Sequence, residues 1–211
     1  MKIIKIINEK YGQNNFLCVE GSEAILIDAS ANVSQIEENL KMCGEKPKLL
    51  AIMLTHEHFD HIVELDNLVA KYSCPVFIHK LGKANLYIEE HNLSALDRPF
   101  KIKTKRGIKT FGDEQEIVIG SFKIKCYHLP GHSMGSSAYV IDKNMFVGDT
   151  VFKVDIGRND MFGGDEIVQK ISLSRLLNNL STDINEYYAG HGANFDNDDL
   201  KYNLERFLGD N

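Results

Sequence analysis

Thr55-His56-Glu57-His58-Phe59-Asp60-His61 is the stretch of this chain that says most about its fold and its chemistry. It directly follows residues 49–54, a continuous apolar run short enough to be a strand buried on both faces. A loop after a buried strand is held rigidly and can turn several side chains towards one point. Without a bound metal ion, three histidines and an aspartate so close together would be crowded polar groups that each need a partner. The stretch therefore predicts a metal site at the end of a buried strand.

The spacing of these four candidate ligands favours two adjacent metal ions over one. In an extended stretch His56 and His58 point the same way, because side chains alternate with a period of two, and Asp60 continues that phase. Asp60 is also a suitable residue to begin the next helix. His61 lies in the opposite phase, or on the first turn of that helix, and can therefore face a second point nearby.

Further candidate ligands occur downstream, each beside glycine and each after a strand-like run. They lie in Pro130-Gly131-His132-Ser133, Val147-Gly148-Asp149-Thr150 and Ala189-Gly190-His191-Gly192. Glycine permits the tight backbone that lets such loops converge. Each dipeptide alone is as well explained by a structural role. Together with the first cluster, the three indicate a complete ligand set for two ions.

The order of predicted elements suggests two sheets packed together with helices outside. Apolar runs predict strands at 2–7, 16–20, 24–29, 49–54 and 75–79, and helical periodicity predicts helices at 32–43 and 61–71. Four short strands follow at 117–119, 122–127, 137–141 and 144–147, then a helix at 165–180, a strand at 186–189 and a helix at 198–208. Because no linker rich in Pro, Gly or Ser interrupts them, we expect a single domain spanning residues 1–211.

Composition narrows the classes of function. Hydrophobic residues make up 43% of the chain and charged residues 26%, as in ordinary globular proteins. The net charge of −6 argues against a nucleic-acid partner. The one basic cluster, residues 101–106, has the alternation expected of a solvated strand or loop.

No stretch approaches the roughly 18 apolar residues of a membrane span, so we expect no membrane partner. The first seven residues are apolar but interrupted by Lys5, unlike a signal peptide. The four cysteines are far apart, which predicts reduced thiols rather than a cysteine zinc site; they are Cys18, Cys43, Cys74 and Cys126. We therefore expect a cytoplasmic protein acting on a small molecule. The sequence leaves its oligomeric state open.

The motifs resemble those of the metallo-β-lactamase superfamily and, within it, the small glyoxalase II-like (hydroxyacylglutathione hydrolase-like) branch. The resemblance runs in order over almost the whole chain. Its motifs are Thr-His-Glu-His-Phe-Asp-His at 55–61, Leu-Pro-Gly-His-Ser at 129–133, Gly-Asp-Thr-Val-Phe at 148–152, Ile-Gly-Arg-Asn-Asp at 156–160, Gly-Gly-Asp at 163–165 and Gly-His-Gly at 190–192. The resemblance implies an α/β fold, a four-layer αββα sandwich of two mixed sheets with helices on both outer faces.

The same resemblance implies a ligand set. The first metal ion would be held by His56, His58 and His132, the second by Asp60, His61 and His191, with Asp149 bridging them. A β-lactamase of the B1 type would have cysteine in the role of Asp149, so this residue argues against that activity. Imidazole and carboxylate ligands fit two divalent ions, with zinc favoured and iron or manganese as alternatives.

The leading hypothesis is hydrolysis of a thioester, ester or lactone by a hydroxide that bridges the two ions. Asp60 would be the catalytic residue that orients this nucleophile and handles its proton. The substrate-binding residues stay unknown. Arg158 either meets an anionic substrate or pairs with an acidic neighbour such as Asp160 or Asp165. Only twenty residues follow His191, too few for the helical region with which glyoxalase II enzymes contact glutathione.

Two alternatives remain open. A single-iron persulfide dioxygenase would use only a subset such as His56, His132 and Asp149. A non-catalytic metal-binding scaffold would keep the fold without turnover, although such proteins usually lose ligands. Of the remaining histidines, we expect His79 and His91 to be structural or exposed, and His128 to be a candidate for orienting a ligand.

Overall fold

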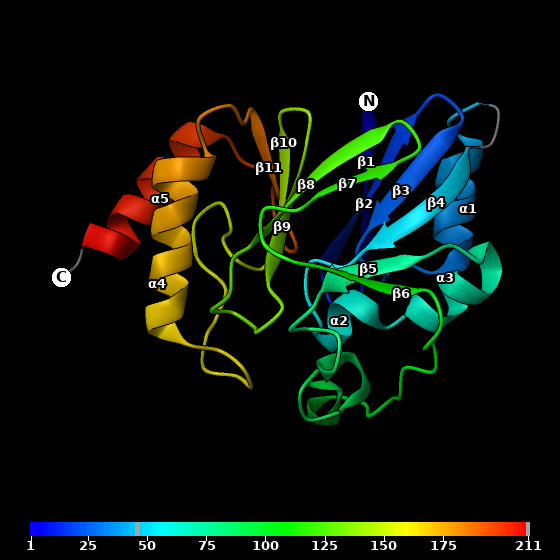
Figure 1. Cartoon of the computed structure of the whole chain (residues 1–211), viewed down its shortest axis with the longest axis horizontal. Coiled ribbons are helices and arrows are strands. Elements are labelled where there is room, and N and C mark those ends of the chain that lie inside the picture. The colour runs from blue at the N-terminus through cyan, green and yellow to red at the C-terminus, as the bar shows by residue number, and fades with distance from the viewer. Residues whose placement is uncertain (45–46, 210–211) are drawn as a thin grey trace.

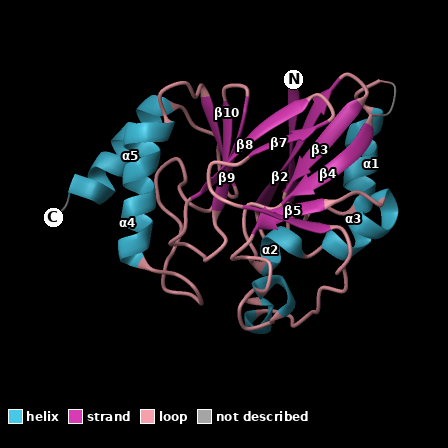
Figure 2. Ribbon diagram, viewed as in Figure 1, coloured by secondary structure: helices cyan, strands magenta, loops and turns pink. Residues whose placement is uncertain are grey.

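The computed structural model describes residues 1–44 and 47–209, and two β-sheets face each other within them (Figures 1 and 2). The first sheet follows chain order: β1 (Lys2–Asn8), β2 (Gln13–Glu20), β3 (Glu23–Ile27), β4 (Lys48–Met53), β5 (Val76–His79) and β6 (Ile108–Phe111). Strands β1 to β3 pair antiparallel, whereas β3 to β6 pair parallel. The carboxyl ends of the parallel strands therefore meet at one edge, where loops can carry a site.

The second sheet is also mixed. Its strands are β7 (Glu116–Ile119), β8 (Phe122–His128), β9 (Ser137–Ile141), β10 (Asn144–Gly148) and β11 (Glu186–Ala189). They lie in the order β11-β10-β9-β8-β7, with only β10 and β11 parallel.

Helices cover the outer faces of both sheets (Figure 1). The first sheet carries α1 (Val33–Lys41) and α3 (Leu65–Tyr72), and the second carries α4 (Glu166–Arg175) and α5 (Asn197–Gly209). A π-helical turn, η3 (Leu176–Leu180), extends α4. The predicted αββα architecture is confirmed. No helix in the described part of the chain is long and apolar enough to cross a membrane.

Three apolar clusters hold these layers together. Along β4, Ala51 and Met53 point into the cluster between the sheets, while Ile52 points towards the helices α1 and α3. A third cluster lies between the second sheet and the helices α4 and α5 and includes Leu173 and Leu200. Because both faces of β4 are buried, its sequence reads as a continuous apolar run rather than an alternating one.

Two elements differ from the sequence-based expectation. The helix predicted at 61–71 is divided into α2 (Phe59–Ile62) and α3. The Ala29 N–H donates to the His61 carbonyl and the Glu64 N–H donates to the Ala29 carbonyl, so the backbone there bonds outside the helix. Strand β6 was not predicted, because its short sequence has apolar side chains only at its two ends. Two 3₁₀ turns, η1 (Asn85–Tyr87) and η2 (Ser94–Leu96), lie between β5 and β6.

Candidate metal centre

The loop after β4 turns from extended chain to helix within the histidine cluster. His58 is extended, with φ −66° and ψ 148°, and α2 begins at the next residue. His58 therefore leaves the backbone from extended chain, and its ring lies 4.6 Å from that of His56 between centroids. Asp60 and His61 lie on the first helical turn, and their side chains meet that of His191 beside the first cluster.

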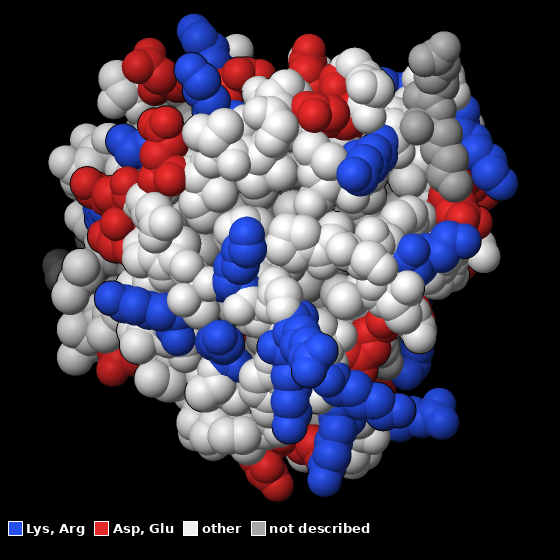
Figure 3. Space-filling model, turned by 45° about the vertical axis from the view of Figure 1, so that its right-hand side comes forward, with Lys and Arg blue, Asp and Glu red and all other residues white. Residues whose placement is uncertain are grey.

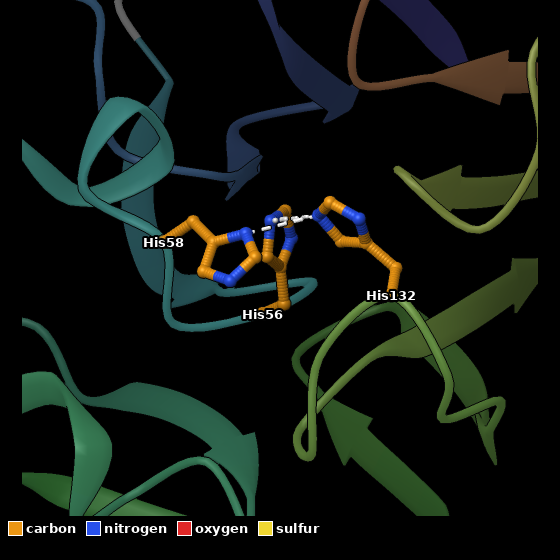
Figure 4. A group of neighbouring side chains, drawn as sticks. All are labelled: His56, His58 and His132. Carbon is orange, nitrogen blue, oxygen red and sulfur yellow. Dashed lines mark hydrogen bonds between the residues drawn. The ribbon is translucent and has the colours of Figure 1, made fainter. Parts of the chain in front are cut away.

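The first group of side chains consists of His56, His58 and His132, all buried (Figure 4). His132 comes from the loop after β8 of the opposite sheet. Its Nε2 atom lies 2.9 Å from His58 Nδ1 and 3.3 Å from His56 Nε2. Three imidazole nitrogens thus converge on one point from two sheets.

The second group consists of Asp60, His61 and His191. The Asp60 Oδ2 atom is 3.1 Å from His191 Nε2 and 3.9 Å from His61 Nε2. Asp149, in the loop after β10, lies between the two groups. Its Oδ1 atom is 3.3 Å from His61 Nε2, and its Oδ2 atom is 3.5 Å from His191 Nε2 and 3.8 Å from His132 Nε2. All seven residues expected as ligands are therefore brought together.

The nitrogen atoms of the first group fit a cation. His132 Nδ1 donates to the Arg158 carbonyl at 2.7 Å, and His56 Nδ1 donates to Thr55 Oγ1 at 3.1 Å. Because the protons are on Nδ1, the Nε2 atoms of both rings carry free lone pairs, and these two atoms face each other. The buried atoms His61 Nε2 and Asp149 Oδ1, which lie 3.3 Å apart beside this group, have no hydrogen-bond partner. Converging lone pairs and unpartnered buried atoms are what a bound metal ion would satisfy.

The local electrostatics keep His56 and His58 neutral. Burial, reinforced by the neighbouring histidines, lowers the pKa of His56 well below its usual value. Burial and His132 lower the pKa of His58 to about 3. Neutral imidazole is the form that coordinates a metal.

The second group is charged in the absence of metal. Burial opposes protonation of His61, but the carboxylates of Asp149, Asp28 and Asp60 raise its pKa well above the usual value. Burial likewise opposes ionisation of Asp149, yet His61 and other site histidines hold its pKa below the usual value. A cation bound here would displace the proton of His61 and take its place beside the carboxylates.

A family model described as the metallo-beta-lactamase superfamily matches residues 9–191. The chain belongs to this superfamily. A relative, the probable metallo-hydrolase YqgX of Bacillus subtilis, is 32% identical over 87% of this chain and 86% of its own length. The protein is thus a probable metal-dependent hydrolase with a histidine-rich site.

Solved structures of the superfamily resemble this chain over nearly its full length. The BLEG-1 B3 metallo-beta-lactamase is 28% identical, with a TM-score of 0.85 over 98% of this chain and 99% of that one. TTHA1623, solved in a di-iron-bound form, is 27% identical, with a TM-score of 0.79 over 99% of this chain and 100% of that one. The glyoxalase II-like branch is not singled out by these relatives and stays a prediction.

Residues outside the ligand set hold the candidate ligands in place by hydrogen bonds. Asp28, which follows β3, accepts from His61 Nδ1 at 2.8 Å and from the Thr55 backbone N–H at 2.8 Å. Asp28 is buried and has a positive φ of 62°, a strained backbone for a residue other than glycine. Asp28 could not be predicted from the sequence, because its role depends on β3 lying beside β4.

Glu57 ties together the two loops that carry the first group. Its side chain is buried. The carboxylate accepts from Ser133 Oγ at 3.1 Å, from the Gly135 N–H at 3.3 Å and from Asn85 Nδ2 at 3.1 Å. One carboxylate thus connects the loop after β4 with the loop that holds His132.

Glu57→Ala is expected to destabilise the fold by about 2–4 kcal/mol, because buried donors lose their acceptor and a cavity remains. Metal affinity should fall by roughly 10–100-fold, as is typical when an orienting contact of a ligand is removed. Urea unfolding and metal titration would measure the two effects. Glu90→Ala, at an exposed position, is the matched control and should change neither. Unchanged metal affinity in Glu57→Ala would contradict an orienting role.

Two histidines outside the ligand set form a stacked pair across the sheets. The rings of His79 and His128 are 3.7 Å apart between centroids and nearly parallel, at 16°. His79 is buried, in line with the structural role expected for it. His128 does not bond His132 directly; its Nε2 atom lies 3.0 Å from the Met134 carbonyl in the same loop.

The buried His79 predicts a loss of stability in acid. Burial, with His128 beside it, lowers the pKa of His79 to about 4 from 6.5. The unfolded chain therefore binds a proton at this position between pH 6.5 and 4 that the folded chain does not, and stability falls as pH falls through that window. The expected loss is up to about 3 kcal/mol. Urea unfolding of metal-loaded protein at each pH should show a shallower dependence for His79→Phe; an unchanged slope would contradict this account.

Proposed function

We propose that this protein is a binuclear metal-dependent hydrolase of thioesters, esters or lactones, resembling glyoxalase II. One observation carries the proposal: the Asp149 carboxylate lies between the two ligand groups. Its oxygen atoms are 3.3 to 3.8 Å from histidine nitrogens of both groups. A carboxylate in that position suits the bridge between two ions, whereas a site for one ion would need no such bridge.

The proposed assignment gives each ion its own ligands. The first ion would be held by His56, His58 and His132 and the second by Asp60, His61 and His191, and Asp149 would be shared. The donor set fits zinc, and also iron or manganese. When bound, two such ions would supply Lewis acidity for a carbonyl group and a water with a pKa of about 7 as the nucleophile.

Asp60 is the proposed catalytic residue. Its side chain lines the cavity beside the metal centre and is partly open to it, whereas His61 is fully buried. The Asp60 Oδ2 atom lies 3.1 Å from His191 Nε2, so both atoms face the place of the second ion. It can therefore hold the attacking water in line with the carbonyl and accept a proton from it.

A second candidate function is β-lactam hydrolysis, favoured by the similarity to the BLEG-1 structure. A β-lactam is a cyclic amide, and its opening needs the same nucleophile and the same polarised carbonyl. A single-iron persulfide dioxygenase is less well supported, because the side chains of the second group are all present and together.

The test is a hydrolysis screen on zinc-loaded protein with metal counting in parallel. The panel contains S-lactoylglutathione, other thioesters, simple esters, lactones and β-lactams. We expect two ions per chain and turnover of at least one ester or thioester. One iron per chain with oxygen consumption on a persulfide would replace the proposal by the dioxygenase. Turnover of β-lactams alone would favour the second candidate.

A further inference from the structure

A cavity of about 460 Å³ opens beside the metal centre, and apart from Arg158 its walls beyond the candidate ligands are apolar. One wall comes from α2 and the η2 region, the other from the segment after β10. The apolar lining residues are Phe59, Leu93, Leu96, Phe152, Ile156 and Met161. A cavity of this kind binds an apolar group and excludes water from the reacting atoms.

The apolar character continues to the outer edge of the cavity. Leu96 is 69% exposed although it lines the cavity. Phe162, which follows the lining residue Met161, is also exposed, and its ring stacks on His91 with centroids 3.6 Å apart. Large apolar side chains held open at the mouth of a cavity indicate that part of a ligand covers them.

Beyond this mouth the surface is basic. Residues 98–106, here called the basic segment, contain five basic and no acidic residues: Arg98, Lys101, Lys103, Lys105 and Arg106. All five are exposed, while Ile102 between them is buried. In the described part of the chain only Lys101 has a carboxylate within 4.0 Å, that of Glu89. Residues 80–109 carry a net charge of +5, whereas the rest of the chain carries −11. Figure 3 shows Lys and Arg side chains gathered in the lower part of the view, on the side of the connection between β5 and β6.

The basic segment begins at the cavity mouth. Leu96 precedes Arg98 by two residues. Asp97, between them, accepts from Tyr11 Oη at 3.0 Å, and the Tyr11 ring packs edge-on against the lining residue Phe59 at 5.3 Å between centroids. On the opposite wall Arg158 is the one basic residue among those that line the cavity. It pairs with Asp160 at 2.7 Å, but both side chains are 64% exposed, and such a pair contributes little and exchanges readily for another anion.

We propose that the substrate is an amphiphilic thioester, with an apolar acyl group in the cavity and a leaving thiol that bears several phosphate-like negative charges. The acyl chain lies between the two apolar walls, and the charged part of the leaving group lies along the basic segment. This inference rests on the proposed hydrolase function and names its substrate class. Water adds to the carbonyl carbon, the carbon–sulfur bond breaks, and the sulfur leaves with the electron pair and one proton. The products are a carboxylic acid and a thiol.

A kinetic test uses four thioesters on the zinc-loaded enzyme. Acetyl and octanoyl groups are each joined to coenzyme A, which carries phosphates, and to N-acetylcysteamine, which is neutral. Each buried methylene strengthens binding about fourfold, so octanoyl should exceed acetyl by at least about 30-fold in kcat/KM on both thiols. Coenzyme A should exceed N-acetylcysteamine by about 10-fold at low salt, and the difference should shrink in 0.5 M salt. Equal rates for the two acyl groups, or for the two thiols at low salt, would overturn the proposal.

Exposed positions allow variants that keep the fold. Leu96→Ser should lower kcat/KM for the octanoyl thioesters about 5–10-fold and leave the acetyl thioesters unchanged. Its matched control is Leu81→Ser, an exposed leucine that does not line the cavity. The double variant Lys103→Ala, Lys105→Ala should lower kcat/KM about 5-fold for coenzyme A thioesters at low salt only. Lys123→Ala with Lys125→Ala, exposed and alternating on β8, should have no effect. If either variant changed kcat/KM by no more than its own control, the proposal would be overturned.

A binding test separates this proposal from the hydrolase function itself. S-octyl-coenzyme A is a thioether and cannot be hydrolysed. Calorimetry should show that it binds at least about 30-fold more tightly than S-methyl-coenzyme A, and about 10-fold more tightly than S-octyl-N-acetylcysteamine at low salt. This result without turnover of any thioester would contradict the proposed reaction but support the ligand class. Turnover of thioesters with no such preference in binding would contradict the ligand class alone.

Discussion

Asp149→Ala is expected to lose both metal ions and to reduce kcat/KM by at least about 1,000-fold. The Asp149 oxygens lie within 3.8 Å of His61, His132 and His191, so one truncation removes a ligand from each ion. Without the carboxylate, the histidines face one another with nothing to balance a pair of divalent charges. Metal counting after gel filtration and the rate on the best substrate of the hydrolysis screen would measure both effects.

The control for this variant is Asp155→Ala, an exposed aspartate on the same connection. It should retain two ions and full turnover. Circular dichroism should show both variants folded, because Asp149 has unfavourable burial of its own without metal. If Asp149→Ala kept two ions or more than a tenth of the activity, the bridging role would be wrong.

Gly190→Ala is expected to have the second-largest effect, through a single methyl group. A Cβ atom at Gly190 would lie 2.1 Å from Asp149 Oδ1 and 2.6 Å from His61 Cε1. Both side chains would have to move away from the metal centre. Because a misplacement of about 1 Å costs roughly 100-fold in rate, we expect at least that loss, with weaker binding of the second ion.

Gly112→Ala is the matched control, because nothing lies within 4 Å of a Cβ atom there and its φ is not positive. It should leave metal content and rate unchanged. Isothermal titration with zinc would follow the two binding steps in each variant. Wild-type affinity at both steps in Gly190→Ala would show that the centre tolerates the displacement.

The candidate ligands could be predicted from the sequence, because each of them lies in a recognisable local motif. His56, His58, Asp60 and His61 are adjacent in the chain, and His132 and His191 follow strand-like runs beside glycine. Strand and helix periodicity was likewise sufficient for most elements, because burial on both faces leaves a strong apolar pattern in β2 to β4. The two-sheet architecture followed from the order of these elements.

The contacts that orient the ligands were not accessible, because they depend on which segments meet in space. Asp28 reaches Thr55 only because β3 and β4 pair in register, with Ile27 opposite Met53. Glu57 looks like a spacer between two histidines, and its partners come from two other loops. The break between α2 and α3 has the same origin, since the backbone of Ala29 supplies the competing hydrogen bonds.

Each ligand group of the metal centre combines residues from both sheets, and this has a consequence for folding. His58 and His132 are 74 residues apart in the chain, and Asp60 and His191 are 131 residues apart. An ion that holds such a pair acts as a crosslink across the sandwich and limits how far the sheets can separate in a partial opening. Amide protons of β4 in the first sheet and β9 in the second should therefore exchange with deuterated solvent faster once the metal is removed by a chelator. Amides of α5, which lies outside the crosslinked loops, should exchange at the same rate with or without metal.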